Sequence, residues 1–195
     1  MIKSSEFTLG PHVDKFEKAF SKFIGVKNCI ATNSGTDSLI LALKSLSVKK
    51  DDEVITVCNS FYATAGAIVA CGAKPVFVDC DERYQIDINK IEKAITKKTK
   101  AIVVVHYLGV PVDMPKVMSI AKKHKLFVLE DCALSLGAKV DNIHTGLHGH
   151  AGVFSFYPVK HITSAEGGMV ITNNKKLANK NVMGHDVDLK WCKLM

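Results

Sequence analysis

Long apolar runs are missing from this sequence, and its first residues, MIKSSEFTLG, lack the apolar centre of a signal peptide. The sequence therefore predicts no membrane span and no secretion signal, and we expect a cytoplasmic protein. No CxxC pair occurs among the six cysteines, so a zinc site is not expected. Several cysteines lie in apolar stretches, which is typical of small core residues in a reducing compartment. They are Cys29, Cys58, Cys71, Cys80, Cys132 and Cys192.

A basic face for nucleic acid is also missing. Lys and Arg number 26 against 19 Asp and Glu, which gives a net charge of +7. The excess is spread over short lysine pairs near predicted helix ends, without a basic helix face or interleaved aromatic residues. A lysine-rich surface explains this pattern better, and we expect no nucleic-acid partner.

What the sequence does contain is a regular alternation of strand-like and helix-like segments. Its 195 residues, 47% hydrophobic and 23% charged, suffice for one sizeable core, and no linker or repeat divides them. Short apolar segments predict strands at 28–32, 53–58, 74–79, 101–106 and 126–131, and periodicity predicts helices at 12–25, 37–46, 63–72, 87–95 and 113–124. Strands apolar on both faces that alternate with helices indicate an α/β fold, with a mostly parallel sheet between two helical layers.

The alternation of strand-like and helix-like segments stops after Asp131. Residues 136–152 are rich in Gly and His and predict a loop, and two short strands follow at 153–158 and 168–173. A lysine-rich helix is predicted from residue 173 onward, without a clear end. Irregular segments after sheet strands are where α/β proteins gather ligands, so this part of the chain is expected to carry function.

The stretch NSGTDSL lies between a predicted strand and a predicted helix. Backbone N–H groups at Ser34, Gly35 and Thr36 can then bind an anion, which the helix dipole and the hydroxyls also favour. Ordinary capping of the helix by Thr36 or Asp37 explains the same residues. The stretch matches neither a P-loop nor the GxGxxG fingerprint, which weakens mononucleotide and dinucleotide binding.

Two further stretches place polar or aromatic side chains where apolar strands end. Glu130 and Asp131 close one strand, where a partly desolvated carboxylate needs a cation or a donor. A surface acid or a helix cap is the alternative. Phe61 and Tyr62 follow another strand, where a ring can cover a ligand, and simple core packing is the alternative.

Lys160 lies in the apolar, small-residue stretch VFSFYPVKHITSAEGGMVIT, together with Ser155. Lysine is rare in such surroundings unless its amine is paired or bonded, and a desolvated amine is the usual nucleophile for an aldehyde. Gly167 and Gly168 permit close approach of the backbone. A lysine that extends its amine into solvent from a strand end is the alternative.

The four stretches together describe one ligand, with an anion, a flat ring, a ring nitrogen that pairs with a carboxylate, and an aldehyde. Pyridoxal 5'-phosphate has all four groups. Its aldehyde forms a Schiff base with lysine, and an acid that keeps the pyridine nitrogen protonated makes the ring an electron sink. The sequence therefore predicts this cofactor.

The same stretches carry a family resemblance. The sequence resembles the DegT/DnrJ/EryC1/StrS family of sugar-nucleotide aminotransferases along nearly the whole chain. The matching stretches follow one another in the order found in the family. They are FTLGPHVDKFEKAFSKFIGV, ATNSGTDSLILAL, GAKPVFVDCD, VHYLGVPVDM, EDCALSLGA and FSFYPVKHITSAEGGMVITN. The resemblance implies the large domain of a fold type I pyridoxal-phosphate enzyme over residues 1–195, without the family's small C-terminal domain. It also implies a homodimer that moves an amino group from an amino acid, usually glutamate, to a nucleotide-linked keto-sugar in amino-sugar and polysaccharide biosynthesis.

The resemblance implies a role for each matching residue. Lys160 would form the Schiff base and move the proton between the carbons of cofactor and substrate. Asp131 would pair with the pyridine nitrogen. Gly35, Thr36 and Ser155 would hold the phosphate.

Phe61 takes the place of the aromatic residue that stacks on the cofactor ring in the family. Members that replace the lysine by histidine are dehydratases, whereas Lys160 is kept here and His161 follows it, which favours transamination. One departure lies three residues after Asp131, where the family usually has His or Gln and this sequence has Leu134. A polar contact near the cofactor or substrate is then missing.

Two other functions stay open. The missing small domain completes a neighbour's phosphate site in the family, so the chain can also be an inactive relic or a subunit that needs a second chain. Such a chain is expected to expose an apolar patch. A nucleotide-binding oxidoreductase fits the alternation of strands and helices, but the glycine fingerprint is missing and Lys160 stays unexplained.

Overall fold

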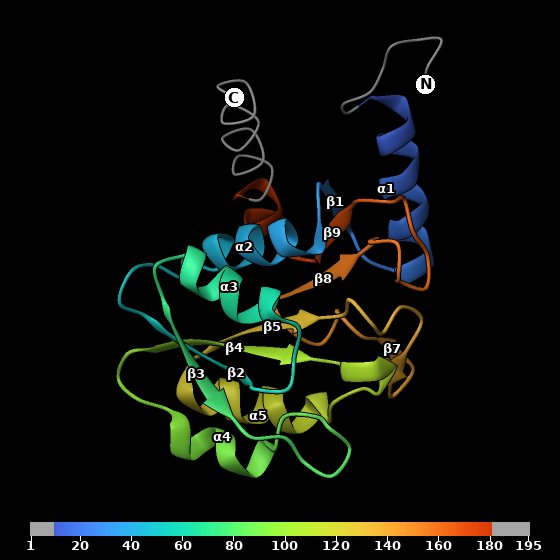
Figure 1. Ribbon diagram of the computed structural model, residues 1–195. Coiled ribbons are helices and arrows are strands. Elements are labelled where there is room, and N and C mark those ends of the chain that lie inside the picture. Colours follow the sequence, from blue (N-terminus) through green and yellow to red (C-terminus); the bar gives the residue numbers. More distant parts are fainter. Residues whose placement is uncertain (1–9, 181–195) are drawn as a thin grey trace.

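The computed structural model describes residues 10–180, and seven short strands form its central sheet. The strands lie in the order β1-β9-β8-β5-β4-β2-β3 (Figure 1). Pairing is parallel from β8 through β5, β4 and β2 to β3 and antiparallel on both sides of β9, so the predicted mostly parallel sheet is confirmed. Their bounds are β1 (Asn28–Thr32), β2 (Glu53–Val57), β3 (Lys74–Val78), β4 (Thr99–Val105), β5 (Phe127–Asp131), β8 (Ala151–Ser155) and β9 (Gly168–Thr172).

Helices cover both faces of this sheet. In Figure 1, α2 and α3 lie on one face, and α4 and α5 lie on the other. The predicted α/β fold with three layers is therefore confirmed. The helices are α1 (Pro11–Ile24), α2 (Gly35–Ser45), α3 (Tyr62–Ala70), α4 (Ile88–Ala94) and α5 (Met114–His124), and residues 175–180 are also helical.

The central strands are apolar on both faces because each face packs against helices. In β4, Ala101 and Val103 belong to the core under α2 and α3, whereas Ile102 and Val104 belong to the core under α4 and α5. Successive side chains of a strand point to opposite faces, so an unbroken apolar run fills two cores. This is why the run AIVVV predicts a buried parallel strand.

A third core lies under α1, on the face of β8 and β9 opposite to α2. The ring of Phe20 lies 5.1 Å from that of Phe154 and 5.7 Å from that of Phe156, both edge-on. Such aromatic pairs contribute about 0.5–1.5 kcal/mol each beyond their buried area. α1 ends at Gly25, whose φ of 79° stops the helix, as its sequence predicts. The helix thereby holds β8, the strand that leads to Lys160.

The loop predicted for residues 136–152 is partly wrong. A small hairpin of β6 (Lys139–Val140) and β7 (Ile143–His144) lies there, and β8 begins inside the predicted loop. The hairpin turn consists of Asp141 and Asn142, with φ values of 49° and 62°, a left-handed conformation that Asp and Asn tolerate. Strands of two residues are too short to produce a visible periodicity.

The cysteine predictions are confirmed only in part. Cys132 is buried, but Cys58 is exposed because it lies just beyond the end of β2. Cys192, and the predicted helix beyond residue 180, lie outside the described residues. Between residues 10 and 180, no helix combines the length and the apolar character needed to cross a membrane.

Backbones approach very closely where β9 begins. A Cβ atom on Gly168 would lie 2.3 Å from the carbonyl oxygen of Ser34, and one on Gly35 would lie 2.7 Å from the Cβ of Ser155. Only glycine, which has no Cβ, permits contacts this short. The start of α2 is therefore held against the adjacent ends of β8 and β9.

We expect Gly168→Ala to lower the free energy of unfolding by about 1–3 kcal/mol, because the added methyl group must displace backbone. Gly66→Ala is the matched control. Gly66 is exposed in α3 with open space at its Cβ position, and alanine there should raise stability by about 0.5–1 kcal/mol. Urea unfolding measures both variants. Equal stability of Gly168→Ala and the wild type would contradict the close approach.

Candidate functional site

The carboxyl ends of the parallel strands bring most of the predicted site residues to one edge of the sheet. Because β9 is antiparallel to both β1 and β8, those two strands run in the same direction. At their common edge, β1 leads into α2, β5 ends at Asp131, and β8 ends at Ser155. Ligands of open α/β sheets bind outside this edge.

Gly35, Thr36 and Ser155 come together at the start of α2. The side chain of Ser34 caps this helix by accepting a hydrogen bond from the N–H of Asp37 at 3.1 Å. The alternative of capping by Thr36 or Asp37 is therefore wrong. Because Gly35 packs directly on Ser155, a hydroxyl-bearing residue lies beside the N-terminal end of an 11-residue helix. Helix dipole and hydroxyls together suit an anion.

Asp131 is buried at the end of β5, on the face that α2 and α3 cover. Its Oδ1 accepts a hydrogen bond from the N–H of Ala133 and its Oδ2 one from the hydroxyl of Thr64, both at 3.1 Å. Burial raises the pKa of Asp131, and these donors and the nearby charge of Lys160 offset the effect only in part. Asp131 is not the surface acid of the alternative prediction. Such a carboxylate gains from a further donor or a cation.

Lys160 lies in the loop between β8 and β9 and is half-buried. Its charge acts on the pKa of Asp131, so the ammonium group lies within electrostatic reach of that carboxylate. Neither side chain forms an ion pair within residues 10–180. Phe156 closes the loop, since its N–H donates to the carbonyl of Gly167 at 2.8 Å and its carbonyl accepts from the N–H of Ser164 at 3.1 Å.

Phe61 directly precedes α3 and is 64% exposed, and the neighbouring Tyr62 is 77% exposed, with 4.2 Å between the ring centroids. The alternative of core packing is therefore wrong for both rings. Thr64, in the first turn of α3, binds Asp131, so Phe61 is held close to that carboxylate. Leu134 is half-buried in the turn after β5.

Glu130 has a different set of partners, on the opposite face of the sheet. Its Oε1 accepts hydrogen bonds from the N–H groups of His148 at 2.8 Å and Gly149 at 2.6 Å. Its Oε2 accepts from the N–H of Gly146 at 2.8 Å and pairs with Nε2 of His106 at 3.0 Å. We call this group of residues the Glu130 hub.

The ring of His106 is fixed in one tautomer within this hub. Its Nδ1 accepts a hydrogen bond from the N–H of Val112 at 3.1 Å, so Nε2 carries the proton that it donates to Glu130. Burial alone would raise the pKa of Glu130, but His106 and the backbone donors hold it below its usual value. The hub thus ties the ends of β4 and β5 to the loop before β8. Sequence reasoning missed it, although the Gly- and His-rich stretch was a visible signal.

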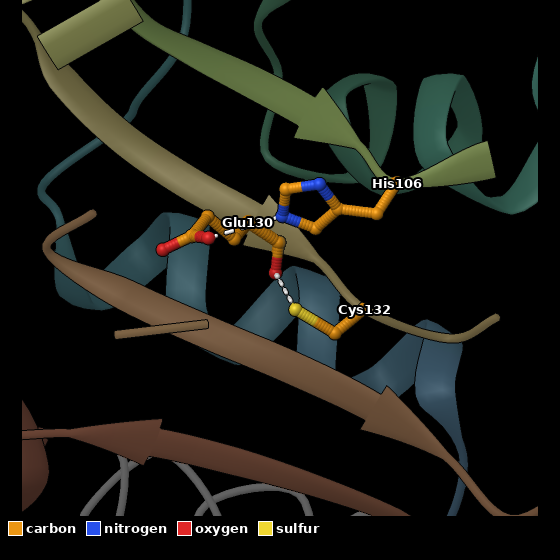
Figure 2. Close-up of side chains that lie close together, drawn as sticks. All are labelled: His106, Glu130 and Cys132. Carbon is orange, nitrogen blue, oxygen red and sulfur yellow. Dashed lines mark hydrogen bonds and ion pairs between the residues drawn. The ribbon is translucent and has the colours of Figure 1, made fainter. Parts of the chain in front are cut away.

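His106, Glu130 and Cys132 lie close enough together to suggest a metal site (Figure 2). Their contacts describe hydrogen bonding instead. Both ring nitrogens of His106 and both carboxylate oxygens of Glu130 have partners, and the thiol of Cys132 donates to the carbonyl of Glu130 at 3.8 Å. Burial and the charge of Glu130 raise the pKa of Cys132 well above its usual value, which keeps the sulfur a thiol and a poor metal ligand.

Comparison with known proteins identifies the family. Residues 1–188 match the model of the DegT/DnrJ/EryC1/StrS aminotransferase family. The chain belongs to this family. It is 43% identical over 182 residues to a UDP-N-acetyl-3-dehydro-alpha-D-glucosamine 3-aminotransferase of Acidithiobacillus ferrooxidans, a match that covers 92% of this chain and 49% of the relative. The chain therefore spans about half the length of the curated relatives it matches.

Solved structures show the same fold. DesV of S. venezuelae, in complex with a ketimine intermediate, superposes with a TM-score of 0.90 at 36% identity, over 93% of this chain and 50% of that one. NtdA of Bacillus subtilis, with bound cofactor PMP, gives a TM-score of 0.88 at 36% identity, over 93% and 41% of the two chains. The predicted aminotransferase fold is confirmed for the portion that this chain shares with them.

We expect Glu130→Gln to lower the free energy of unfolding by about 3 kcal/mol or more, because the amide nitrogen would face hydrogen-bond donors on either side. The exposed Glu82→Gln is the control, with a change within about 0.5 kcal/mol. Since the folded pKa of Glu130 is lowered, its stabilisation is present above the unfolded pKa of about 4.3 and is lost as pH falls through the folded value. Urea unfolding at neutral and acidic pH measures this.

Chelation separates the hub from a metal site. Since hydrogen bonds alone hold these side chains, EDTA should leave the unfolding midpoint of the wild type unchanged. A lower midpoint in EDTA, restored by added zinc, would show that a metal stabilises them instead.

Asp131→Asn should stabilise the cofactor-free protein at neutral pH. The folded pKa of Asp131 is raised, so the stability it contributes is present below the unfolded pKa of about 3.9 and is lost as pH rises through the folded value. At neutral pH the buried charge is then a penalty that asparagine removes. Urea unfolding should show an advantage of Asp131→Asn that shrinks toward pH 4. A less stable variant at neutral pH would contradict this sign.

Proposed function

We propose that this chain is the cofactor-binding part of a pyridoxal-phosphate-dependent aminotransferase that acts on a nucleotide-linked keto-sugar. Family membership supports the reaction class, and the name of the Acidithiobacillus ferrooxidans relative supports the substrate class. The observation that carries the proposal is a buried carboxylate, Asp131, at the edge where the sheet binds ligands, together with a half-buried amine, Lys160, whose positive charge lowers the pKa of that carboxyl.

The residues at this edge fit the groups of pyridoxal phosphate. The contact between Gly35 and Ser155 leaves the N-terminal end of α2 and a hydroxyl beside each other, which suits the phosphate. Asp131 has two hydrogen-bond donors and a raised pKa, so a protonated ring nitrogen would supply the missing positive partner. Thr36 would add a hydroxyl, and the exposed ring of Phe61 would stack on the pyridine.

Each residue then has a defined task. When bound, the cofactor would supply a protonated pyridine ring that withdraws electrons from the reacting substrate carbon. Asp131 would accept the hydrogen bond of the ring nitrogen and so keep its proton in place. Nζ of Lys160 would bind the aldehyde and later hold the proton that moves to and from the substrate. Lys160 and Asp131 are therefore the proposed catalytic residues, and Gly35, Thr36, Phe61 and Ser155 complete the proposed cofactor site.

An amino acid, in our proposal glutamate, would donate the amino group, and a homodimer would be the working assembly. The exposed apolar side chains at this edge, among them Tyr62, Tyr84 and Leu108, are compatible with a further surface packing over the site. The end product would be an amino sugar.

Covalent capture tests this proposal. After incubation of the 195-residue chain with stoichiometric pyridoxal phosphate and reduction with borohydride, mass spectrometry should find the added mass on the peptide that contains Lys160. Lys160→Ala should abolish this label and reduce amino transfer from glutamate to a nucleotide-linked keto-sugar by about a thousandfold or more. Lys97→Ala, at an exposed position, is the control and should change neither.

The outcomes separate the hypotheses. Label on Lys160 together with amino transfer supports the full proposal. Label without transfer supports a cofactor-binding subunit that needs a second chain. A wild type without specific label on Lys160 refutes the cofactor assignment.

A further inference from the structure

Two hydroxyl groups, of Ser60 just before α3 and of Thr64 within it, form a hydrogen-bonded chain to the buried carboxylate of Asp131. Oγ of Ser60 lies 2.8 Å from Oγ1 of Thr64, and the Thr64 hydroxyl donates to Oδ2 of Asp131 at 3.1 Å. An ionised carboxylate only accepts hydrogen bonds. The single proton of Thr64 is thereby committed to Asp131, and the Thr64 oxygen accepts from Ser60. The chain therefore has one direction, from Ser60 through Thr64 to Asp131.

The N-terminus of α3 does not use these hydroxyls as caps. Phe61 occupies the N-cap position and makes no side-chain capping bond, although Ser60 precedes it and Thr64 lies in the first turn. Serine and threonine near a helix N-terminus usually satisfy its free N–H groups. Here both hydroxyls belong to the chain that ends on Asp131. These two hydroxyls therefore hydrogen-bond toward the carboxylate of Asp131 and do not cap α3.

The hydrogen bond from Thr64 to Asp131 connects the helical turn that carries Phe61 to the carboxylate of the proposed site. The N–H of Thr64 donates to the carbonyl of Phe61 at 3.1 Å, so both residues belong to one helical turn. Phe61 presents an exposed ring, and Asp131 lies at the end of β5. A rigid flat ligand that stacks on the ring and pairs with the carboxylate requires a fixed distance between them.

Few groups contact the carboxylate of Asp131 and can fix its orientation. The charged or titratable side chains that act on it include Lys160, from the loop after β8, His106, from the end of β4, and the neighbouring Cys132. The N–H of Ala133 binds Oδ1. Thr64 is therefore the side chain that holds Oδ2, and it is 2% exposed, so water does not readily replace it.

We propose that Thr64, oriented by Ser60, is a positioning residue that aligns the carboxylate of Asp131 with the ring of Phe61 for the ring nitrogen of the cofactor. This inference rests on the proposed function. Thr64 itself does not touch the reacting atoms. Its loss should weaken cofactor binding and the retention of the ring proton, while the fold persists.

Thr64→Val tests this inference, because valine keeps the shape and removes the hydroxyl. We expect pyridoxal phosphate to bind about tenfold more weakly, as for the loss of one hydrogen bond to a charged group. The pKa of the ring nitrogen, measured by nitrogen-15 NMR of labelled bound cofactor, should fall because the ring proton is held less firmly. In the cofactor-free protein, the carbon-13 resonance of the Asp131 carboxyl should titrate at higher pH. Thr64→Ser should restore all three readouts.

Thr56→Val is the matched control. Thr56 is also buried, and its hydroxyl donates to the carbonyl of Val103 at 3.1 Å, away from the site. It should leave cofactor affinity and both titrations unchanged. Circular dichroism and urea unfolding confirm that both valine variants fold.

A double-mutant cycle separates positioning from general packing. In the Asp131→Asn background, Thr64→Val should have little further effect on cofactor affinity, because the carboxylate it orients is gone. An equal loss in both backgrounds, or a Thr64→Val protein with wild-type affinity and titrations, overturns the inference. A wild type that shows no borohydride-stable label on Lys160 overturns the proposed function and this inference with it.

Discussion

A carboxylate buried at the end of a parallel strand is unfavourable unless donors or a cation compensate its charge. Strand β5 ends with two such groups, and the chain treats them differently. Glu130 receives four donors and keeps a lowered pKa, whereas Asp131 receives two donors and keeps a raised one. Of these two carboxylates, Asp131 is therefore the one that would gain more from a further positively charged partner. That imbalance defines the candidate site.

Separate devices hold the parts of the site in place. The Glu130 hub fixes the loop before β8, and the close contacts of Gly35 and Gly168 hold the start of α2 against the ends of β8 and β9. Thr64 fixes the start of α3 to Asp131. Each of these sets of contacts acts on a different element. The start of α2, the carboxylate of Asp131 and the ring of Phe61 in the proposed cofactor site are therefore positioned by helices and strands.

Much of the fold could be predicted from sequence because its signals are local. The run AIVVV and the glycine that ends α1 each specify an element within a few residues. Predictions were wrong where the signal was short or depended on surroundings. The hairpin of β6 and β7 is too short to show a period, and Cys58 lies just past a strand end, where apolar neighbours in sequence do not ensure burial.

The sequence by itself determined which chemical groups are available: an amine in an apolar stretch, acids at a strand end and hydroxyls at a helix start. It also determined that these groups follow strands of a parallel sheet, whose carboxyl ends meet at one edge. Only the tertiary structure decided that Glu130 and Asp131 serve opposite faces and that His106 and Thr64 are their partners. Those contacts join residues far apart in the chain, and they depend on strand order and packing, which local periodicity does not encode.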